Sequence, residues 1–295
     1  MIKKVSKGEK IFSIFNYIFL SITAFICLIP IINVLALSFS TSTAAASGLV
    51  KLWPVDFTLE SYSFIMDKPD FIRSLLVTIK RASLGLIINM ALVILIAYPL
   101  SKEKNVFRGR NIYAWFFLIT MLFSGGLIPS YMTIKKVGIL DTVWALVLPG
   151  AVPVFNVLIL MNFMRGLPKE IEESAFIDGA GPWTSLFKIV IPLSIPSLAT
   201  ITLFTLVGHW NSWFDGLIYM NNPRNYPLQS YLQTVVISRD LSLAMDTSQA
   251  AALAKVSDRT TKSAQVFLAA LPIMMVYPFL QKYFMTGLVM GSVKG

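Results

Sequence analysis

The sequence predicts an all-α integral membrane protein with six transmembrane helices. Hydrophobic residues make up 56% of its 295 residues and charged residues only 14%, whereas soluble domains carry roughly 25% charged residues. The mean hydropathy is +0.70. The apolar residues form long continuous runs, which excludes a β-barrel, whose strands alternate apolar and polar positions. Helices satisfy their own backbone groups in lipid, so we expect every run to be helical.

Six apolar runs approach or exceed the roughly 20 residues that cross about 30 Å of hydrocarbon. The first is much longer than the roughly 7–15 apolar residues of a signal-peptide core, so we expect an uncleaved first span. The six expected spans are Ile11–Leu37, Ala82–Leu100, Ile112–Met132, Val143–Met164, Leu193–Phe214 and Ala264–Tyr283.

The net charge of +10 indicates membrane topology rather than nucleic-acid binding, because the basic residues lie between apolar runs. Two clusters flank the first two spans: Lys3, Lys4, Lys7 and Lys10, and then Lys102, Lys104, Arg108 and Arg110. Basic residues collect on the cytoplasmic side. We therefore expect both termini in the cytoplasm, with an N-terminal segment 1–10, a six-span domain 11–284 and a tail 285–295.

The segment Phe71–Arg81 fits this scheme poorly, because it places Arg73, Lys80 and Arg81 just before the second span. At helical spacing the three share one face. We expect an amphipathic segment at the outer interface, with the charged groups reaching water. The alternative is that the second span begins earlier and these charges face the protein interior.

Signatures of enzyme chemistry are missing from the sequence. It contains no G-x-x-x-x-G-K-[ST] phosphate loop, no H-E-x-x-H and no G-x-S-x-G. One histidine, His209, and one cysteine, Cys27, cannot form a metal cluster or an intrachain disulfide. We therefore expect no catalytic residues, no metal and no cofactor in this chain.

The loop 165–192, between the fourth and fifth spans, has the local chemistry of two short helices. Pro168 suits the start of a helix, and the three glutamates that follow match the positive end of the helix dipole. Gly179 or Gly181 can end the helix in the left-handed conformation. Pro182 can begin a second helix that Pro192 ends. By local physics alone, this loop could be an elbow that merely joins two spans.

The same loop resembles the EAA motif of ABC-importer permeases. The matching residues are Glu173-Ser174-Ala175, then Gly179, then Ile189-Val190-Ile191-Pro192, at the complete spacing. Ser174 and Ile191 are conservative departures from the pattern. The stretch Asp178-Gly179-Ala180 looks like the carbohydrate-uptake branch.

The resemblance covers essentially the whole chain. Three further stretches look like the maltose-type second permease, and more narrowly like the lipoprotein-associated saccharide permeases of Gram-positive bacteria: 125–129, 149–153 and 287–295. The resemblance implies a multi-pass protein of the bacterial cell membrane that imports a saccharide. It also implies a second permease subunit, two copies of a cytoplasmic ABC ATPase that bind ATP and Mg, and an extracellular solute-binding lipoprotein.

In that family the motif loop couples the permease to the ATPase. Small residues would permit close approach and acidic residues could meet basic groups on the partner. The coupling candidates are Glu172, Glu173, Ala175, Asp178, Gly179 and Ala180. For Glu173, the alternative is a role in the helix dipole alone.

Two further regions carry expectations. The outer loop 221–262 is long, and long loops are often functional, so we expect it to dock the binding protein; the alternative is a solvated loop. Polar and aromatic residues inside spans are candidates for the substrate path: His209, Trp210, Asn211, Trp213, Asn156 and Asn162. The alternatives are an interfacial aromatic belt and ordinary packing.

Competing functions remain for the chain. An ABC permease for a non-sugar solute would share most of these features. An ion-coupled secondary transporter usually needs acids or histidines within its spans. The six expected spans contain no acid, and Asp215 lies just past the fifth, which argues against that class.

Overall fold

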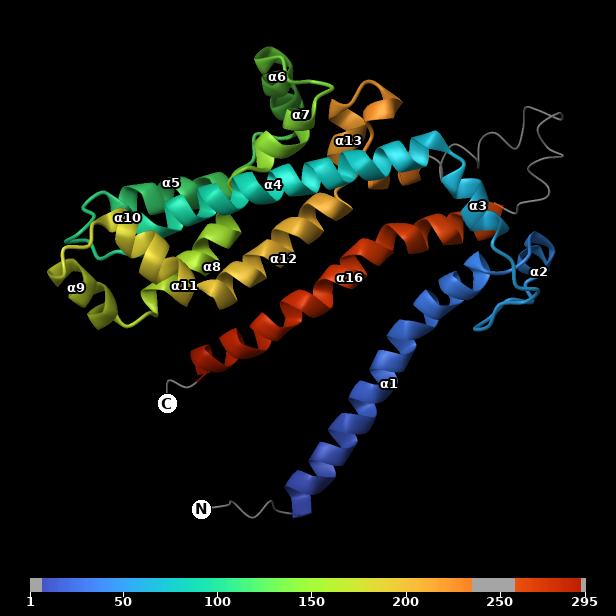
Figure 1. Cartoon of the computed structure of the whole chain (residues 1–295), viewed down its shortest axis with the longest axis horizontal. Helices are drawn as coiled ribbons and strands as arrows, with labels where there is room; N and C mark the ends of the chain where they lie inside the picture. Colours follow the sequence, from blue (N-terminus) through green and yellow to red (C-terminus); the bar gives the residue numbers. More distant parts are fainter. Residues whose placement is uncertain (1–6, 235–257, 293–295) are drawn as a thin grey trace. The chain divides into compact units, whose positions relative to one another are not determined.

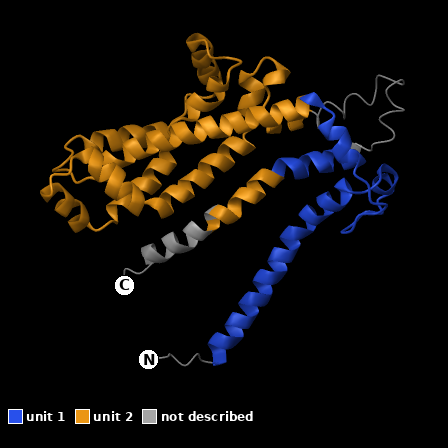
Figure 2. Cartoon of the chain, viewed as in Figure 1, with its two compact units in different colours: residues 1–69, 235–270 blue, residues 70–234, 271–295 orange. Residues whose placement is uncertain are grey.

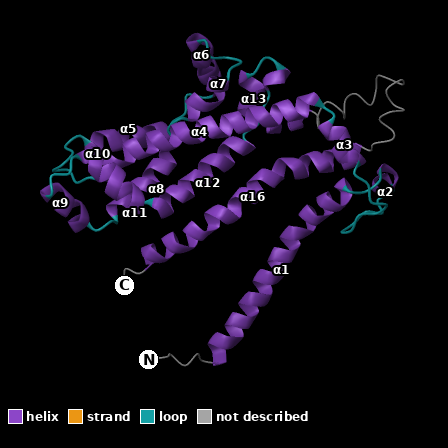
Figure 3. Ribbon diagram, viewed as in Figure 1, coloured by secondary structure: helices purple, strands orange, loops and turns teal. Residues whose placement is uncertain are grey.

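The structure is a computed structural model that describes residues 7–234 and 258–292. The described chain is helical, and its strand pairing is limited to one isolated bridge between Ser40 and Phe57 (Figures 1 and 3). It divides into two compact units (Figure 2). Unit 1 contains residues 1–69 and 235–270, and unit 2 contains residues 70–234 and 271–295.

Unit 1 is built around α1 (Lys7–Ser38), which contains the whole predicted first span. Its apolar side chains are exposed all round, as expected of a helix that meets lipid or partner helices instead of its own core. The helices α2 (Ser42–Ala46) and α3 (Glu60–Met66) follow. A small core joins the end of α1 to α2 and the loop after it: Ala36, Leu37, Ala44, Ala45 and Val50.

Unit 2 begins with α4 (Pro69–Ser101), one continuous helix of 33 residues. Its buried positions recur every three or four residues from Phe71 to Leu100, as one face of a helix must. Polar residues predominate on this buried face from Ser74 to Asn89, and apolar residues follow from Val93 to Leu100. The face includes Phe71, Ser74, Thr78, Arg81, Gly85, Asn89, Val93, Ala97 and Leu100.

The segment Phe71–Arg81 is not a separate helix, because these residues are the first turns of α4 itself. Arg73 and Lys80 are exposed, but Arg81 is only 2% exposed. The alternative therefore holds for Arg81, which turns into the protein. Arg81 is buried because it pairs with Asp215, a residue far along the chain.

Arg81 and Asp215 form a paired, hydrogen-bonded contact between α4 and α13 (Phe214–Tyr219). Arg81 Nη1 donates to Asp215 Oδ1 (3.1 Å) and to the Ser212 carbonyl (3.3 Å), and Nη2 donates to Asp215 Oδ2. Ser212 Oγ and the Gly216 amide also donate to Asp215 Oδ1. A buried charge is tolerated only when paired and hydrogen-bonded, so this contact fixes the start of α4 against α13.

The third and fourth predicted spans are bent pairs rather than single helices. Gly126, with φ +86°, separates α5 (Arg110–Leu122) from α6 (Leu127–Val137), and the two helices diverge by 112°. The fourth comprises α7 (Val143–Val147), η1 (Leu148–Gly150) and α8 (Val154–Arg165), with a bend of 47°. Pro149 and Pro153 explain this second bend, because proline cannot donate to the helix ladder.

The loop 165–192 also ends in a bend. After α9 (Lys169–Ile177), the chain forms α10 (Pro182–Ser185), a π-helical stretch η2 (Leu186–Val190) and α11 (Ile191–Leu193), and then turns by 80° into α12 (Ile195–Asn211). Pro192 accounts for the π-helix. It has no N–H for the Lys188 carbonyl, and the Ile191 N–H instead reaches back to the Leu186 carbonyl.

The end of the chain differs from expectation in its boundaries. Within the predicted outer loop 221–262, η3 (Pro223–Asn225) and residues 228–234 are helical. The helix α16 (Asp258–Ser292) begins before that loop was expected to end and extends beyond the predicted sixth span. Residues 235–257, which make up more than half of the loop expected to dock the binding protein, lie outside the described residues.

Three helices, α1, α4 and the Arg259–Phe279 part of α16, are each long and apolar enough to cross a membrane. The number rises to six if each bent pair is one span. The chain is thus an all-helical membrane protein with three to six candidate spans. Sequence hydropathy located these spans but did not show that three of them are broken.

The main core of unit 2 joins α4, α8 and α12 through apolar side chains that include Val93, Leu160 and Ile201. Closer to α13, the His209 side chain of α12 packs directly on Gly85 of α4, which leaves no room for a Cβ there. A Cβ on Gly85 would lie 2.2 Å from His209 Nε2.

We expect Gly85→Ala to destabilise the protein by about 1–3 kcal/mol, because the added methyl must displace a buried imidazole. Gly208→Ala on α12 is the matched control, since a Cβ there meets nothing within 4 Å. The measurement is thermal unfolding of the purified transporter in detergent. An unchanged midpoint for Gly85→Ala would mean that the helices can separate without cost.

Candidate functional site

The candidate site is built on α9, whose two ends are defined by local chemistry. Pro168 precedes the helix, and Glu170 and Glu172 occupy its first turn, where the dipole favours acids. At the other end Gly179 has φ +84°. The Ala180 N–H bonds the Ala175 carbonyl and the Gly179 N–H bonds the Phe176 carbonyl. This is a Schellman ending, so the prediction of a left-handed glycine is confirmed at Gly179.

Glu172 ties α9 to two other elements. Tyr98 Oη on α4 (2.9 Å) and Ser185 Oγ on α10 (2.7 Å) donate to its Oε1, and Lys102 Nζ contacts both carboxylate oxygens. Lys102 also lies over the Tyr98 ring, 4.0 Å from its centroid. These contacts hold α9 against the end of the long helix α4. We call this set, Tyr98, Lys102, Glu172 and Ser185, the Glu172 clamp.

Burial alone would raise the pKa of Glu172. The hydrogen bonds from Lys102, Ser185 and Tyr98 outweigh it and hold the pKa below its ordinary value of 4.5. The clamp's contribution to stability is therefore complete above the ordinary pKa and is lost as pH falls through the lower, folded-state value. At neutral pH the carboxylate is ionised and the clamp is closed.

A second ion pair, at the solvent-exposed surface, lies beside the Lys102–Glu172 pair. Lys169, the first residue of α9, pairs with Glu103 in the loop after α4. Both groups are exposed, and the pairing lowers the pKa of Glu103 and raises that of Lys169. Exposed pairs stabilise little. This pair orients the start of α9, and the Glu172 clamp holds it.

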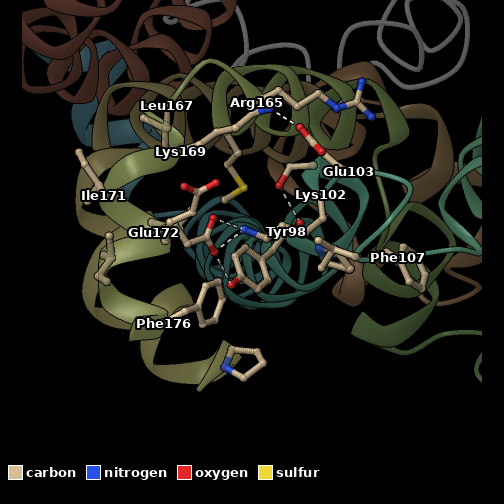
Figure 4. Close-up of a pocket in the computed structure, with 18 of the residues that line it drawn as sticks. Tyr98, Lys102, Glu103, Phe107, Arg165, Leu167, Lys169, Ile171, Glu172 and Phe176 are labelled. Carbon is tan, nitrogen blue, oxygen red and sulfur yellow. Dashed lines mark hydrogen bonds and ion pairs between the residues drawn. The ribbon is translucent and has the colours of Figure 1, made fainter. Parts of the chain in front are cut away.

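A cavity of about 700 Å³ lies between α9, the ends of α4 and α8, and the loop before α5 (Figure 4). The Glu172 clamp forms part of its wall. Apolar side chains such as Phe107, Leu167 and Ile171 line it together with Arg110 and Arg165.

The surface of α9, α10 and η2 combines exposed apolar and acidic groups. Ile177 is 86% and Trp183 64% exposed, and Trp183 stacks on the exposed Phe187 of η2. Glu173 and Asp178 are exposed along and at the end of α9. Large apolar side chains exposed in this way mark a binding surface. Sequence analysis missed Ile177, Trp183 and Phe187 because an apolar side chain in a short amphipathic helix reads equally well as core.

The predicted coupling residues fall into three groups. Glu173, Asp178 and Gly179 are exposed and could meet a partner. Ala175 and Ala180 are half-buried and form the helix ending. Glu172 turns inward and is engaged within the chain, so it holds α9 in position. Its partners were not foreseeable, because Lys102 and Tyr98 lie some 70 residues away in the sequence.

The structure does not bring the predicted substrate-path residues together. His209 and Trp210 are buried, and His209 Nε2 lies 3.4 Å from Asn89 Nδ2. Asn156 is buried and donates to Thr205 Oγ1 (3.3 Å).

The other three predicted substrate-path residues, Asn162, Asn211 and Trp213, are exposed. Trp210 and Trp213 do not share a helix face, because α12 ends at Asn211 and Ser212 is extended.

Comparison with known proteins assigns this architecture to a family. Residues 105–289 match the family described as "Binding-protein-dependent transport system inner membrane component". The chain belongs to this family. It is therefore a permease subunit, not an enzyme, and a multi-pass protein of the cytoplasmic membrane. The name of the family also establishes that the permease works with a binding protein.

Individual relatives agree over nearly the whole permease. Protein LplC of Bacillus subtilis (strain 168) is 40% identical over 98% of this chain and 97% of its own length. The polygalacturonan/rhamnogalacturonan transport system permease protein YtcP of the same organism is 39% identical, with 97% and 99% covered. A chain in the crystal structure of a bacterial ABC transporter involved in the import of the acidic polysaccharide alginate superposes with a TM-score of 0.86 at 31% identity, covering 95% and 99% of the two chains.

We expect Glu172→Gln to destabilise the permease by about 1–3 kcal/mol, because it removes the charge that three donors share. Thermal unfolding of the assembled transporter at pH 7 is the measurement. Glu170→Gln is the matched control, an exposed glutamate on the same helix. The stability difference between wild type and Glu172→Gln should disappear as the pH falls below about 4.5, since protonation of Glu172 in the wild type opens the clamp that the glutamine variant already lacks. Equal stability of the two variants at pH 7 would contradict the clamp.

Proposed function

We propose that this permease imports a saccharide or oligosaccharide, coupled to ATP hydrolysis by a partner. The sugar class is supported by the relatives, since YtcP is a polygalacturonan/rhamnogalacturonan transporter subunit and the structural relative belongs to an alginate importer. The assembly would contain a second permease, two copies of an ABC ATPase that bind ATP and Mg, and an extracellular solute-binding lipoprotein. A non-sugar solute is the alternative for the same architecture.

The observation that carries the coupling proposal is the surface of α9, α10 and η2 held by the Glu172 clamp. It is apolar at Ile177, Trp183 and Phe187 and acidic at Glu173 and Asp178. A protein partner with a basic-rimmed apolar groove fits this surface. The clamp then makes α9 a rigid lever, so a push from the ATPase moves α4 rather than bending the loop. Segment 165–192 is the coupling loop in this proposal, and the tail 285–295 lies on the same side.

The proposed topology has six spans with both termini in the cytoplasm. The bent pairs α5–α6, α7–α8 and α10–α12 would each serve as one span. The C-terminal end of α4, α9 and the loop after α4 would then face the cytoplasm, and the loop between α1 and α4 would face outward. The basic residues of the loop after α4 support this orientation.

Cysteine labelling tests that topology. In a Cys27→Ala background, we expect Lys104→Cys to react with a membrane-impermeant maleimide only after the cells are opened. Trp53→Cys is the matched control for the opposite face, because Trp53 is 81% exposed in the loop between α1 and α3. It should react in intact cells. Labelling of Lys104→Cys in intact cells would invert the proposed orientation.

The coupling proposal is tested at Gly179. We expect Gly179→Leu to reduce binding-protein-stimulated ATP turnover at least tenfold and to weaken ATPase assembly, because bulk at an exposed interface position prevents docking. Gly179→Ala is the control. It carries the same left-handed strain, about 1–2 kcal/mol, and its Cβ meets nothing within 4 Å in the chain.

Three outcomes are distinguishable. Loss in Gly179→Leu with activity retained in Gly179→Ala supports an interface. Equal loss in both would trace the effect to the helix ending instead. Full activity in Gly179→Leu would leave the segment as an elbow that joins two spans.

The substrate path is proposed for the exposed polar residues Asn162 and Asn211 together with Trp213, with His209, Trp210 and Asn156 as their supports. An exposed amide in a membrane helix is costly unless it faces a cavity or a partner. Sugar uptake at saturating binding protein by Asn211→Ala tests this role, and unchanged kinetics would remove Asn211 from the path.

A further inference from the structure

The cavity beside α9 is lined by positive charges, of which the Glu172 clamp neutralises only that of Lys102. Four basic residues line it: Lys102, Arg110, Arg165 and Lys169. Lys102 is paired with Glu172 and Lys169 with Glu103. Within the described parts of the chain, neither Arg110 nor Arg165 lies within salt-bridge distance of a carboxylate. Glu103 feels the charge of Arg110, but its carboxylate is bonded to Lys169.

The two arginines converge on the same place from different elements. Arg165, at the end of α8, donates from Nη2 to the Leu100 carbonyl (2.9 Å). Arg110, at the start of α5, donates from Nη1 to the Lys102 carbonyl (3.2 Å). Both therefore cap the negative end of α4, and their positive charges are close enough to repel each other.

Capping alone does not use the Arg165 side chain fully. A guanidinium has five N–H donors, and the contact with Leu100 uses one of those on Arg165. Arg110 is more fully engaged, because its Nε and Nη2 also donate to Asn111 Oδ1. Both arginines line the cavity without an ion pair to a carboxylate among the described residues, so a bound anion would compensate their charges. A phosphate group matches guanidinium geometry.

The rest of the wall indicates what carries the phosphate. Phe107, Leu167, Ile171, Phe176 and Ile189 line the same cavity, which suits an aliphatic chain better than a hydrated ion. The cavity also lies at the C-terminal ends of α4, a candidate span, and of α8, the second half of a bent pair. The proposed topology would place these ends at the depth of lipid headgroups. Basic pockets between helices at this depth bind anionic headgroups.

We propose that this cavity binds an anionic phospholipid, with its phosphate between Arg110 and Arg165 and its glycerol and upper acyl region against the apolar wall. The bound lipid would fill the space behind α9 and screen the repulsion between the two arginines. This inference goes beyond the transported solute and does not depend on which saccharide is carried.

The test uses the whole transporter, purified with its partner subunits in detergent. Native mass spectrometry measures binding of phosphatidylglycerol and, separately, of phosphatidylcholine. We expect phosphatidylglycerol to bind preferentially and Arg110→Gln and Arg165→Gln each to weaken it about fivefold. Arg108→Gln is the matched control. It makes the same change two residues from Arg110, at an exposed position that does not line the cavity.

Lysine variants control for a general loss of folding in the glutamine variants. Arg110→Lys and Arg165→Lys keep the charge but not the two-pronged geometry, and we expect them to retain most of the preference for phosphatidylglycerol in the assembled complex. Normal phosphatidylglycerol binding in both glutamine variants would overturn the proposal. So would an equal loss in Arg108→Gln, which would indicate general surface charge.

Inorganic phosphate separates the two sources of the anion. At millimolar concentration it should neither displace phosphatidylglycerol nor protect the complex against heat. If it does both, and the effects disappear in Arg110→Gln, the cavity is a site for free phosphate and the lipid proposal is wrong. None of these readouts requires transport, so they remain informative even if the proposed solute class is incorrect.

Discussion

The carboxylate of Glu172 is the contact on which the position of α9 depends. It accepts hydrogen bonds from α4, from the loop after α4 and from α10. The other ion pair that joins α9 to the rest of unit 2 among the described residues, Lys169–Glu103, is exposed and weak. The clamp therefore fixes α9 and α10 against the end of α4. In the proposed coupling role, this connection would let the three elements transmit a movement together.

The breaks in the helices have a common physical origin. Gly126 and the proline-containing stretches at 149–153 and 192–196 interrupt what would otherwise be plain apolar spans. Each break leaves backbone groups that the helix no longer satisfies, and lipid cannot satisfy them. Broken helices therefore require protein or water beside them. This requirement fits a permease, in which the spans must line a path as well as cross the bilayer.

Buried polar groups in unit 2 lie along one side of α4. Arg81 meets Asp215, Asn89 lies beside His209, and Thr78 accepts from the Leu228 amide. An unpaired group at any of these positions would carry a large desolvation cost. The contacts therefore specify one packing of α12, α13 and the following segment against α4. Glycines permit the same packing, because His209 lies where a Cβ on Gly85 would be and Ser230 lies where a Cβ on Gly216 would be.

The sequence by itself determined the class of the protein, the position of its apolar runs and the left-handed ending at Gly179. These depend on hydropathy over about 20 residues and on local backbone sterics, which neighbouring residues decide. Tertiary structure decided the direction of each charged side chain. The sequence predicted Arg81 at the membrane interface, whereas the structure pairs it with Asp215. The sequence predicted Glu172 as a contact to the ATPase, whereas the structure bonds it to Lys102 and Tyr98 of the same chain. Such pairings join residues about 70 to 134 positions apart, and local pattern contains no information about contacts over that distance.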